Sequence, residues 1–192
     1  GVIEKIPYLK ELGINCVEIM PIFEFEEFLP GRPDDEFCNY WGYVTYNYFS
    51  PKAGYAAAGK NGLAADELKN MIKQLHKNGI EVILDIVFNH TGEYDDYISF
   101  RGVDNRTYYV IDENGNYANH TGCGNTVNCN NPIVRNFIMD SLRYWVSSYH
   151  VDGFRIDEAP IFARGEDGKP MVCPPLVDTL ANDPILNRTK FI

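Results

Sequence analysis

Two short stretches of the sequence place ionisable side chains among apolar residues. DIVFNH carries Asp85, Asn89 and His90, and the later stretch GFRID carries Arg155 and Asp157. If each is a strand, alternate side chains share a face, so the arginine and the second aspartate point the same way. An arginine beside an aspartate favours the ionised carboxylate, which suits a nucleophile rather than a proton donor. We therefore examine both stretches as parts of a catalytic site.

The same residues also have a purely structural interpretation, in which Arg155 neutralises Asp85 or Asp157 in a buried ion-pair network. Polar groups inside a parallel sheet are costly to bury unless they pair. For either stretch alone the structural and functional interpretations weigh about equally. Taken together they favour a site, because two strands of one sheet would both place charge at their carboxyl ends.

One unit, a helix followed by a tight turn and an apolar strand, occurs three times. That order predicts parallel strands joined by crossover helices. The third helix begins with the favourable cap pair Asn131 and Pro132, and its predicted buried stripe starts at Ile133. The predicted helices lie at about residues 4–12, 66–77 and 132–146, and the predicted strands at 14–23, 80–90 and 151–159.

Long segments follow the carboxyl ends of the first two strands, at residues 24–63 and 90–131, and we expect both to be irregular. Ligands bind at this edge in open sheets and in barrels. A doubly wound nucleotide-binding sheet would need a Gly-rich phosphate turn, but the chain contains neither GxGxxG nor GxxxxGK[ST]. We therefore predict an α/β fold, a partial TIM (β/α)8 barrel of about three strand–helix units with long βα loops.

Composition narrows the class of partner. The chain of 192 residues has a net charge of -10, which argues against binding to nucleic acid or an anionic membrane surface. The sequence contains no run of about 18 apolar residues, the length that a membrane-spanning helix needs. The five cysteines show no metal-type CxxC spacing, and Cys123 and Cys129 are close enough in sequence to form a disulfide. We interpret the protein as intracellular or organellar.

The first long segment contains the aromatic run NYWGYVTYNYF. Aromatic faces stack on the apolar faces of sugar rings, but most such side chains pack a loop onto its domain. Trp41 and Tyr43, on either side of Gly42, are the two that we expect to face a ligand.

DIVFNH together with GFRID resembles the paired strand motifs of the alpha-amylase superfamily, glycoside hydrolase family 13. NYWGY followed by NYFSP, NHTGE, GCGNTVNCNNP and PPLVDTLANDPIL is similar to the isoamylase and glycogen-debranching group. The resemblance extends over nearly the whole chain, and five motifs in this order are highly specific.

The resemblance implies a retaining glycosidase, which forms a covalent intermediate on one carboxylate and uses a second, protonated one as the acid. Asp157 is the implied nucleophile, with Arg155 keeping it ionised. His90 is implied to bind the sugar at the cleavage subsite, and Tyr43 to stack beneath it. The residues implied to support the site are Asp85 and Asn89.

One departure bears on the linkage that is cleaved. Plain alpha-amylases of the family carry a Lys-His pair shortly after the nucleophile, where this chain has Pro160 and Ile161. That disfavours an endo-acting alpha-1,4 amylase and agrees with an alpha-1,6 debranching enzyme. Glu158 replaces the apolar residue usual in that group. No cofactor is expected, although the superfamily often uses the residue matching Asn89 as a calcium ligand, which leaves calcium open.

The resemblance places the general-acid Glu and a second Asp beyond TKFI, which looks like the start of the next strand. Residues 1–192 are thus expected to form a segment of a (β/α)8 catalytic barrel, about strands 2 to 4, that is inactive without the remainder of the barrel or a partner chain. The parent is expected to hydrolyse alpha-1,6 linkages of glycogen, starch or amylopectin in the cytoplasm or plastid. The alternatives are a branching-type transferase and a non-catalytic glucan-binding or partner subunit.

Overall fold

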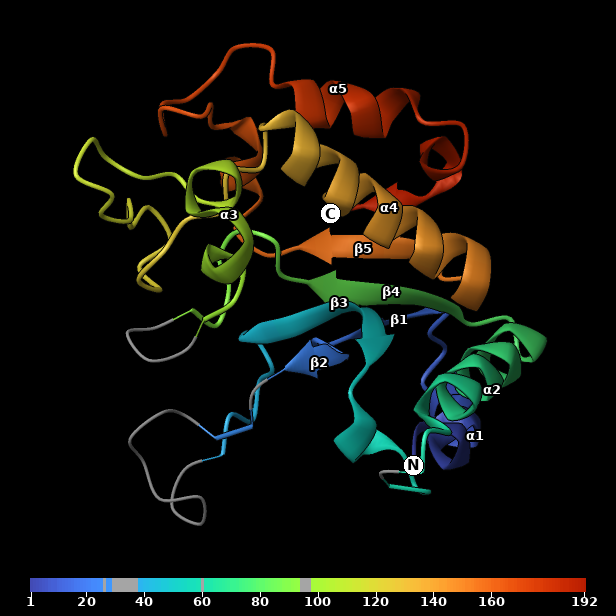
Figure 1. The fold of residues 1–192 in the computed structure, drawn as a ribbon. Coiled ribbons are helices and arrows are strands. Elements are labelled where there is room, and N and C mark those ends of the chain that lie inside the picture. The colour runs from blue at the N-terminus through green and yellow to red at the C-terminus, as the bar shows by residue number, and fades with distance from the viewer. Residues whose placement is uncertain (26, 29–37, 60, 94–97) are drawn as a thin grey trace.

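The computed structural model describes residues 1–25, 27–28, 38–59, 61–93 and 98–192 (Figure 1). Its largest element is a parallel sheet in the strand order β1-β4-β5-β6. This order confirms the expected succession of parallel strands joined by crossover helices. The strands of the sheet are β1 (Cys16–Ile19), β4 (Glu81–Ile86), β5 (Gly153–Ile156) and β6 (Lys190–Phe191).

Helix α2 precedes β4 and helix α4 precedes β5, and both helices lie alongside the sheet (Figure 1). Helix α3 lies near the carboxyl ends of these two strands. Within the described ranges, no helix has the length and apolar character needed to cross a membrane. The α-helices are α1 (Ile6–Glu11), α2 (Ala64–Lys77), α3 (Arg101–Tyr108), α4 (Pro132–Tyr149) and α5 (Pro175–Asn182). The 3-10 helices are η1 (Val2–Lys5), η2 (Ala53–Tyr55), η3 (Ala159–Ala163) and η4 (Leu186–Arg188).

Helix α4 begins where its cap residues predict. The Asn131 side chain accepts a hydrogen bond from the Ile133 N–H at 3.0 Å, which satisfies one of the free donors of the first turn. The expectation that Ile133 opens the buried stripe is wrong, because its side chain is 58% exposed. The buried stripe starts one residue later, at Val134, which faces the core.

The predicted strand at residues 14–23 is in fact two elements. Strand β1 ends before Pro21, and β2 (Phe23–Phe25) pairs antiparallel with β3 (Thr45–Pro51) in a separate two-stranded sheet. Proline has no N–H to donate to a ladder, so the chain leaves the parallel sheet at this position. The two long segments are therefore less irregular than expected, since the first contains β3 and the second contains α3.

Helix α4 fixes the β2–β3 sheet to the core. The carbonyl oxygen of Tyr48 accepts hydrogen bonds from the Trp145 indole at 2.9 Å and from the Ser141 hydroxyl at 2.7 Å. The Trp145 ring also stacks on Phe23 with centroids 4.6 Å apart. These contacts hold the first long segment against the sheet, and so fix the position of the aromatic residues that it carries.

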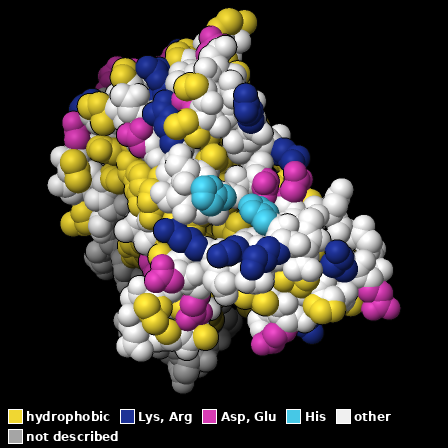
Figure 2. Space-filling model, turned by 90° about the vertical axis from the view of Figure 1, so that its right-hand side faces the viewer, with side chains coloured by type: hydrophobic (Ala, Val, Ile, Leu, Met, Phe, Trp, Pro, Cys, Tyr) yellow, Lys and Arg dark blue, Asp and Glu magenta, His cyan; other side chains and the backbone are white. Residues whose placement is uncertain are grey.

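A basic groove of about 600 Å³ lies between the C-terminal ends of α2 and α4, where Lys and His side chains gather (Figure 2). It lies at the amino ends of the strands, because His76 in its lining contacts Asp152, just before β5, at 2.7 Å. Lys73 and Lys77 lie near the last turn of α2, where cations offset the negative end of the helix dipole. This groove is thus at the opposite end of the sheet from DIVFNH.

Candidate active site

An arginine on β5 joins two carboxylates at the carboxyl edge of the sheet. Arg155 pairs with Asp85 in the register of β5 and β4, and its Nη1 lies 3.0 Å from Asp85 Oδ1. The same nitrogen lies 2.8 Å from Asp157 Oδ1. Hydrogen bonds to Asp85 and Asp157 raise the pKa of the Arg155 guanidinium, against the opposing effect of burial. The side chains at positions 155 and 157 therefore meet on one face, as strand alternation predicts.

The second oxygen of Asp157 is held by an amide. Asn89 Nδ2 donates to Asp157 Oδ2 and to the Asp157 carbonyl oxygen, both at 3.0 Å, and the Asn89 side chain is buried. The Asp157 N–H donates in turn to Ile86 O at 3.0 Å, which fixes the turn after β5. Because a guanidinium and an amide both donate to it, this carboxylate has a defined orientation.

His90 is buried beside the same carboxylate, with 5% of its surface exposed. Its Nδ1 hydrogen-bonds Asn89 Oδ1. Burial lowers the pKa of the His90 imidazole, and the negative charge of Asp157 opposes that effect. The ring is therefore favoured in its neutral form at neutral pH, in which it can exchange hydrogen bonds with a neutral ligand such as a sugar hydroxyl.

Tyr43 reaches the site from the first long segment. Its hydroxyl donates to Asp85 Oδ2 at 2.6 Å, and burial, reinforced by this bond, raises the pKa of Tyr43 to about 12. Trp41 packs edge-on against Tyr43, with centroids 6.3 Å apart, and is 65% exposed. Gly42 between them has φ +83, and an added Cβ would lie 3.0 Å from a Phe25 ring carbon. The turn therefore requires glycine, and it places one aromatic ring inside the site and the other at its rim.

The charges near the site also affect the pKa values of two further residues, Glu158 and Cys123. Glu158 is an exposed residue with φ 46, and partial desolvation followed by the charge of Asp157 raises the pKa of its carboxyl group. Burial and then the charge of Glu158 raise the pKa of the Cys123 thiol. Cys123 and Cys129 are both free thiols in the structure, so the disulfide that their spacing allows is not formed. Cys123 Sγ contacts the Thr121 carbonyl oxygen at 3.8 Å, whereas Cys129 Sγ contacts that of Phe88 at 3.6 Å.

Both oxygen atoms of Asn89 are engaged in hydrogen bonds. Its side-chain oxygen is engaged by His90, and its carbonyl oxygen accepts the Val127 N–H at 2.9 Å. Among the described residues, no group of three or more Asp, Glu, His or Cys side chains could hold a metal ion. The donors that the structure places around Asn89 are therefore arranged for hydrogen bonding.

Comparison with known proteins decides the family. The family model described as "Alpha amylase, catalytic domain" matches residues 1–125, which is more than half of the chain. The chain belongs to the alpha-amylase family. The matched range includes DIVFNH and the aromatic segment but ends before Arg155 and Asp157. The remaining site residues lie within the longer similarities to individual proteins.

Individual relatives of this alpha-amylase family chain confirm its resemblance to the debranching group. Isoamylase 3, chloroplastic, of Oryza sativa subsp. japonica is 52% identical over 202 residues, covering 100% of this chain and 26% of the relative. The glycogen debranching enzyme of Escherichia fergusonii is 44% identical over 190 residues, covering 97% of this chain and 28% of the relative. The chain thus spans about a quarter of the length of these curated relatives.

Solved structures of pullulanases share the fold. The pullulanase from Bacillus acidopullulyticus superposes with a TM-score of 0.72 and 41% identity, covering 81% of this chain and 19% of that one. A pullulanase from Paenibacillus barengoltzii, in complex with maltohexaose and alpha-cyclodextrin, gives a TM-score of 0.73 and 32% identity, covering 81% and 24%. These similarities, with the parallel strand order, confirm the prediction of a partial TIM barrel.

Proposed function

We propose that the full-length protein hydrolyses alpha-1,6 branch linkages of glycogen or starch with retention of configuration, and that Asp157 is its nucleophile. One observation carries this assignment. Arg155 Nη1 bridges Asp157 and Asp85 at the carboxyl edge of the parallel strands, the edge at which TIM-barrel enzymes build their active sites. A structural ion pair needs no such location, whereas a nucleophile does.

In the proposed reaction, Asp157 attacks the anomeric carbon and forms a glycosyl-enzyme ester while the branch oxygen leaves with a proton. The proton comes from a second carboxylic acid, the general acid that a retaining glycosidase requires. Water then attacks the anomeric carbon, the bond to Asp157 breaks and frees its carboxylate, and the same acid group, now ionised, removes the proton from the water. Arg155 and Asn89 hold Asp157 in position, while His90 and Tyr43 line the sugar subsite.

Preference for the alpha-1,6 linkage is inferred from the relatives. The similar proteins bear the names isoamylase, glycogen debranching enzyme and pullulanase. Pro160 and Ile161 stand where plain alpha-amylases carry a Lys-His pair, which supports the same linkage. The chloroplastic names of the plant relatives support a plastid location for the parent protein.

The test compares two aspartates at opposite ends of β5 in the full-length protein. Asp157→Asn should reduce release of linear chains from amylopectin at least roughly 10⁴-fold, because it removes the covalent intermediate. Binding of the glucan should be retained. Asp152→Asn, at the amino end of β5, should leave turnover within about twofold, since Asp152 contacts His76 and the Val82 N–H far from the sugar subsite.

Retained turnover in Asp157→Asn would reject the nucleophile assignment. If the wild-type protein creates new branch linkages instead of linear chains, it is a transferase. If it binds amylopectin without changing it, it is a non-catalytic glucan-binding protein.

A further inference from the structure

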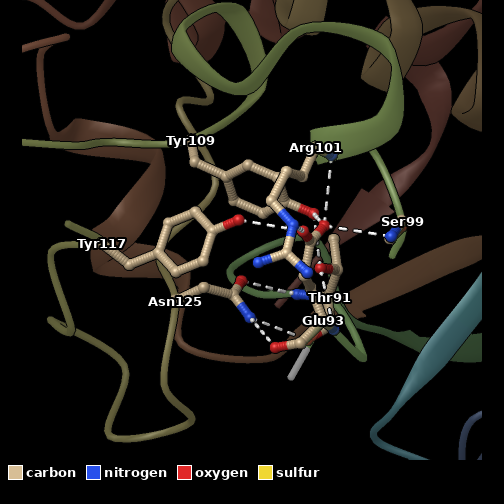
Figure 3. Close-up of polar contacts among 7 residues, drawn as sticks. All are labelled: Thr91, Glu93, Ser99, Arg101, Tyr109, Tyr117 and Asn125. Carbon is tan, nitrogen blue, oxygen red and sulfur yellow. Dashed lines mark hydrogen bonds and ion pairs between the residues drawn. The ribbon is translucent and has the colours of Figure 1, made fainter. Parts of the chain in front are cut away.

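A fully buried carboxylate lies three residues after His90 and outside the set of residues assigned above (Figure 3). Oε2 of Glu93 accepts hydrogen bonds from the Tyr109 hydroxyl at 2.6 Å and from the N–H groups of Ser99 and Arg101 at 3.1 Å and 3.2 Å. Its Oε1 accepts from the Tyr117 hydroxyl at 2.9 Å and lies 2.9 Å from Arg101 Nε. Five donors from three segments therefore converge on one side chain.

The donor set requires an acceptor with no proton of its own. Burial raises the pKa of the Tyr109 and Tyr117 hydroxyls, with the hydrogen bonds to Glu93 as the second cause, so both hydroxyls remain protonated donors. An ionised carboxylate offers about four lone-pair positions and no donor. An amide in place of this carboxylate would direct two N–H donors towards neighbouring groups that are themselves hydrogen-bond donors.

The backbone on both sides of His90 is tied to the same region. The Asn125 side chain accepts the Thr91 N–H at 3.0 Å and donates to the carbonyl oxygens of Thr91 and Glu93 at 3.0 Å and 3.2 Å. On the other side of the histidine, the Asn89 carbonyl oxygen accepts an N–H two residues beyond Asn125. The main chain that carries the imidazole thus has hydrogen-bond partners before and after it, and Figure 3 shows those after it.

We propose that Glu93 is a positioning residue, whose negative charge holds the segment after β4 so that His90 keeps its orientation towards Asp157. Glu93 joins the end of the segment carrying His90 to the start of α3 and to the two tyrosines that follow this helix. Loss of the acceptor would leave buried donors unpaired and allow the segment to shift. The proposal rests on the proposed function, because its consequence is measured at the sugar subsite.

The first experiment compares Glu93→Gln with Asp183→Asn in the full-length protein. Asp183 is a matched control, since its buried carboxylate pairs with Arg143 at 2.6 Å and accepts the N–H groups of Ile185 and Leu186, remote from the site. Both variants should lower the melting temperature. Only Glu93→Gln should also lower kcat/KM on amylopectin, by roughly 10- to 100-fold, as expected for a misplaced active-site group.

A double-mutant cycle with His90→Ala separates positioning from general loss of stability. If Glu93 acts through His90, Glu93→Gln should lower turnover less than about threefold in the His90→Ala background, because the group that it positions is gone. If Glu93→Gln lowers turnover as much in the His90→Ala background as in the wild type, that result would overturn the proposal. So would wild-type kcat/KM in a folded Glu93→Gln protein.

Two further variants keep the result interpretable. Tyr117→Phe removes one hydrogen-bond donor and leaves the Glu93 carboxylate in place. If Glu93→Gln fails to fold, a roughly two- to fivefold loss of kcat/KM in Tyr117→Phe that disappears in the His90→Ala background supports the same role for Glu93. A folded Tyr117→Phe protein with unchanged kcat/KM rejects that role. Asp157→Asn is assayed alongside. Retained turnover there rejects the proposed function, whereas normal turnover of Glu93→Gln beside an inactive Asp157→Asn rejects only the role of Glu93.

Discussion

The hydroxyl of Tyr43 lies 2.6 Å from Oδ2 of Asp85, although 42 positions separate the two residues. Through this bond the aromatic segment after β2 is tied to the charged end of β4. The other oxygen of Asp85 faces Arg155 Nη1 at 3.0 Å, so the aspartate joins the Tyr43 ring to the arginine that holds Asp157. The proposed sugar subsite and the proposed nucleophile are thus parts of one hydrogen-bonded group.

Replacing Tyr43 with Phe tests the value of this bond. Tyr43→Phe should lower the free energy of unfolding by about 1.5–3 kcal/mol, because Asp85 is buried and loses a donor. Glucan affinity should be nearly unchanged, since the ring that stacks on the sugar remains. Tyr43→Ala, which removes the ring as well, should weaken glucan binding in an affinity assay. Equal glucan affinity in the two variants would show that Tyr43 is not a stacking platform.

The buried His90 predicts a pH dependence of stability. Burial lowers the pKa of the folded-state imidazole below its ordinary value, so in the pH range between the two pKa values the unfolded chain binds the proton more readily. The contribution of neutral His90 is therefore fully present above about pH 6.5 and is lost as pH falls through the range below. Urea unfolding at pH 7.5 and 5.5 measures this difference.

His90→Gln should reduce the change in the free energy of unfolding between these two pH values, whereas His120→Gln, at an exposed position, should not. An identical pH dependence in wild type and His90→Gln would contradict the assignment of a buried neutral imidazole.

Gly153 at the start of β5 leaves no room for a side chain. An added Cβ would lie 2.8 Å from both the Cβ and the carbonyl oxygen of its neighbour Lys190, and 3.1 Å from Ile83 Cγ1. Gly153→Ala should therefore push β6 away and destabilise the protein by about 1–3 kcal/mol. Amide hydrogen exchange should accelerate at Ile192, whose N–H donates to Phe154 O at 3.0 Å.

Gly102→Ala is the control for this effect, because a Cβ there meets only the side-chain end of the exposed Ile98. Unchanged exchange at β6 in Gly153→Ala would show that the sheet accommodates the methyl group.

The sequence by itself determined the features that depend on neighbours along the chain. Period-two alternation placed Arg155 and Asp157 on one face, and the cap pair predicted the start of α4, because both follow from local backbone geometry. The order of helices and strands was sufficient to predict a parallel sheet. The family resemblance then named residues that the structure brings together.

Only the tertiary structure decided which distant residues meet. The opposition of Asp85 and Arg155 depends on strand register, and the bond from Tyr43 to Asp85 depends on the β2–β3 sheet that Trp145 holds in place. The donors around Glu93 come from segments whose sequence shows no periodic pattern. Such contacts join residues tens of positions apart. They form only when folding closes the loop between the two residues, so local sequence propensities cannot predict them.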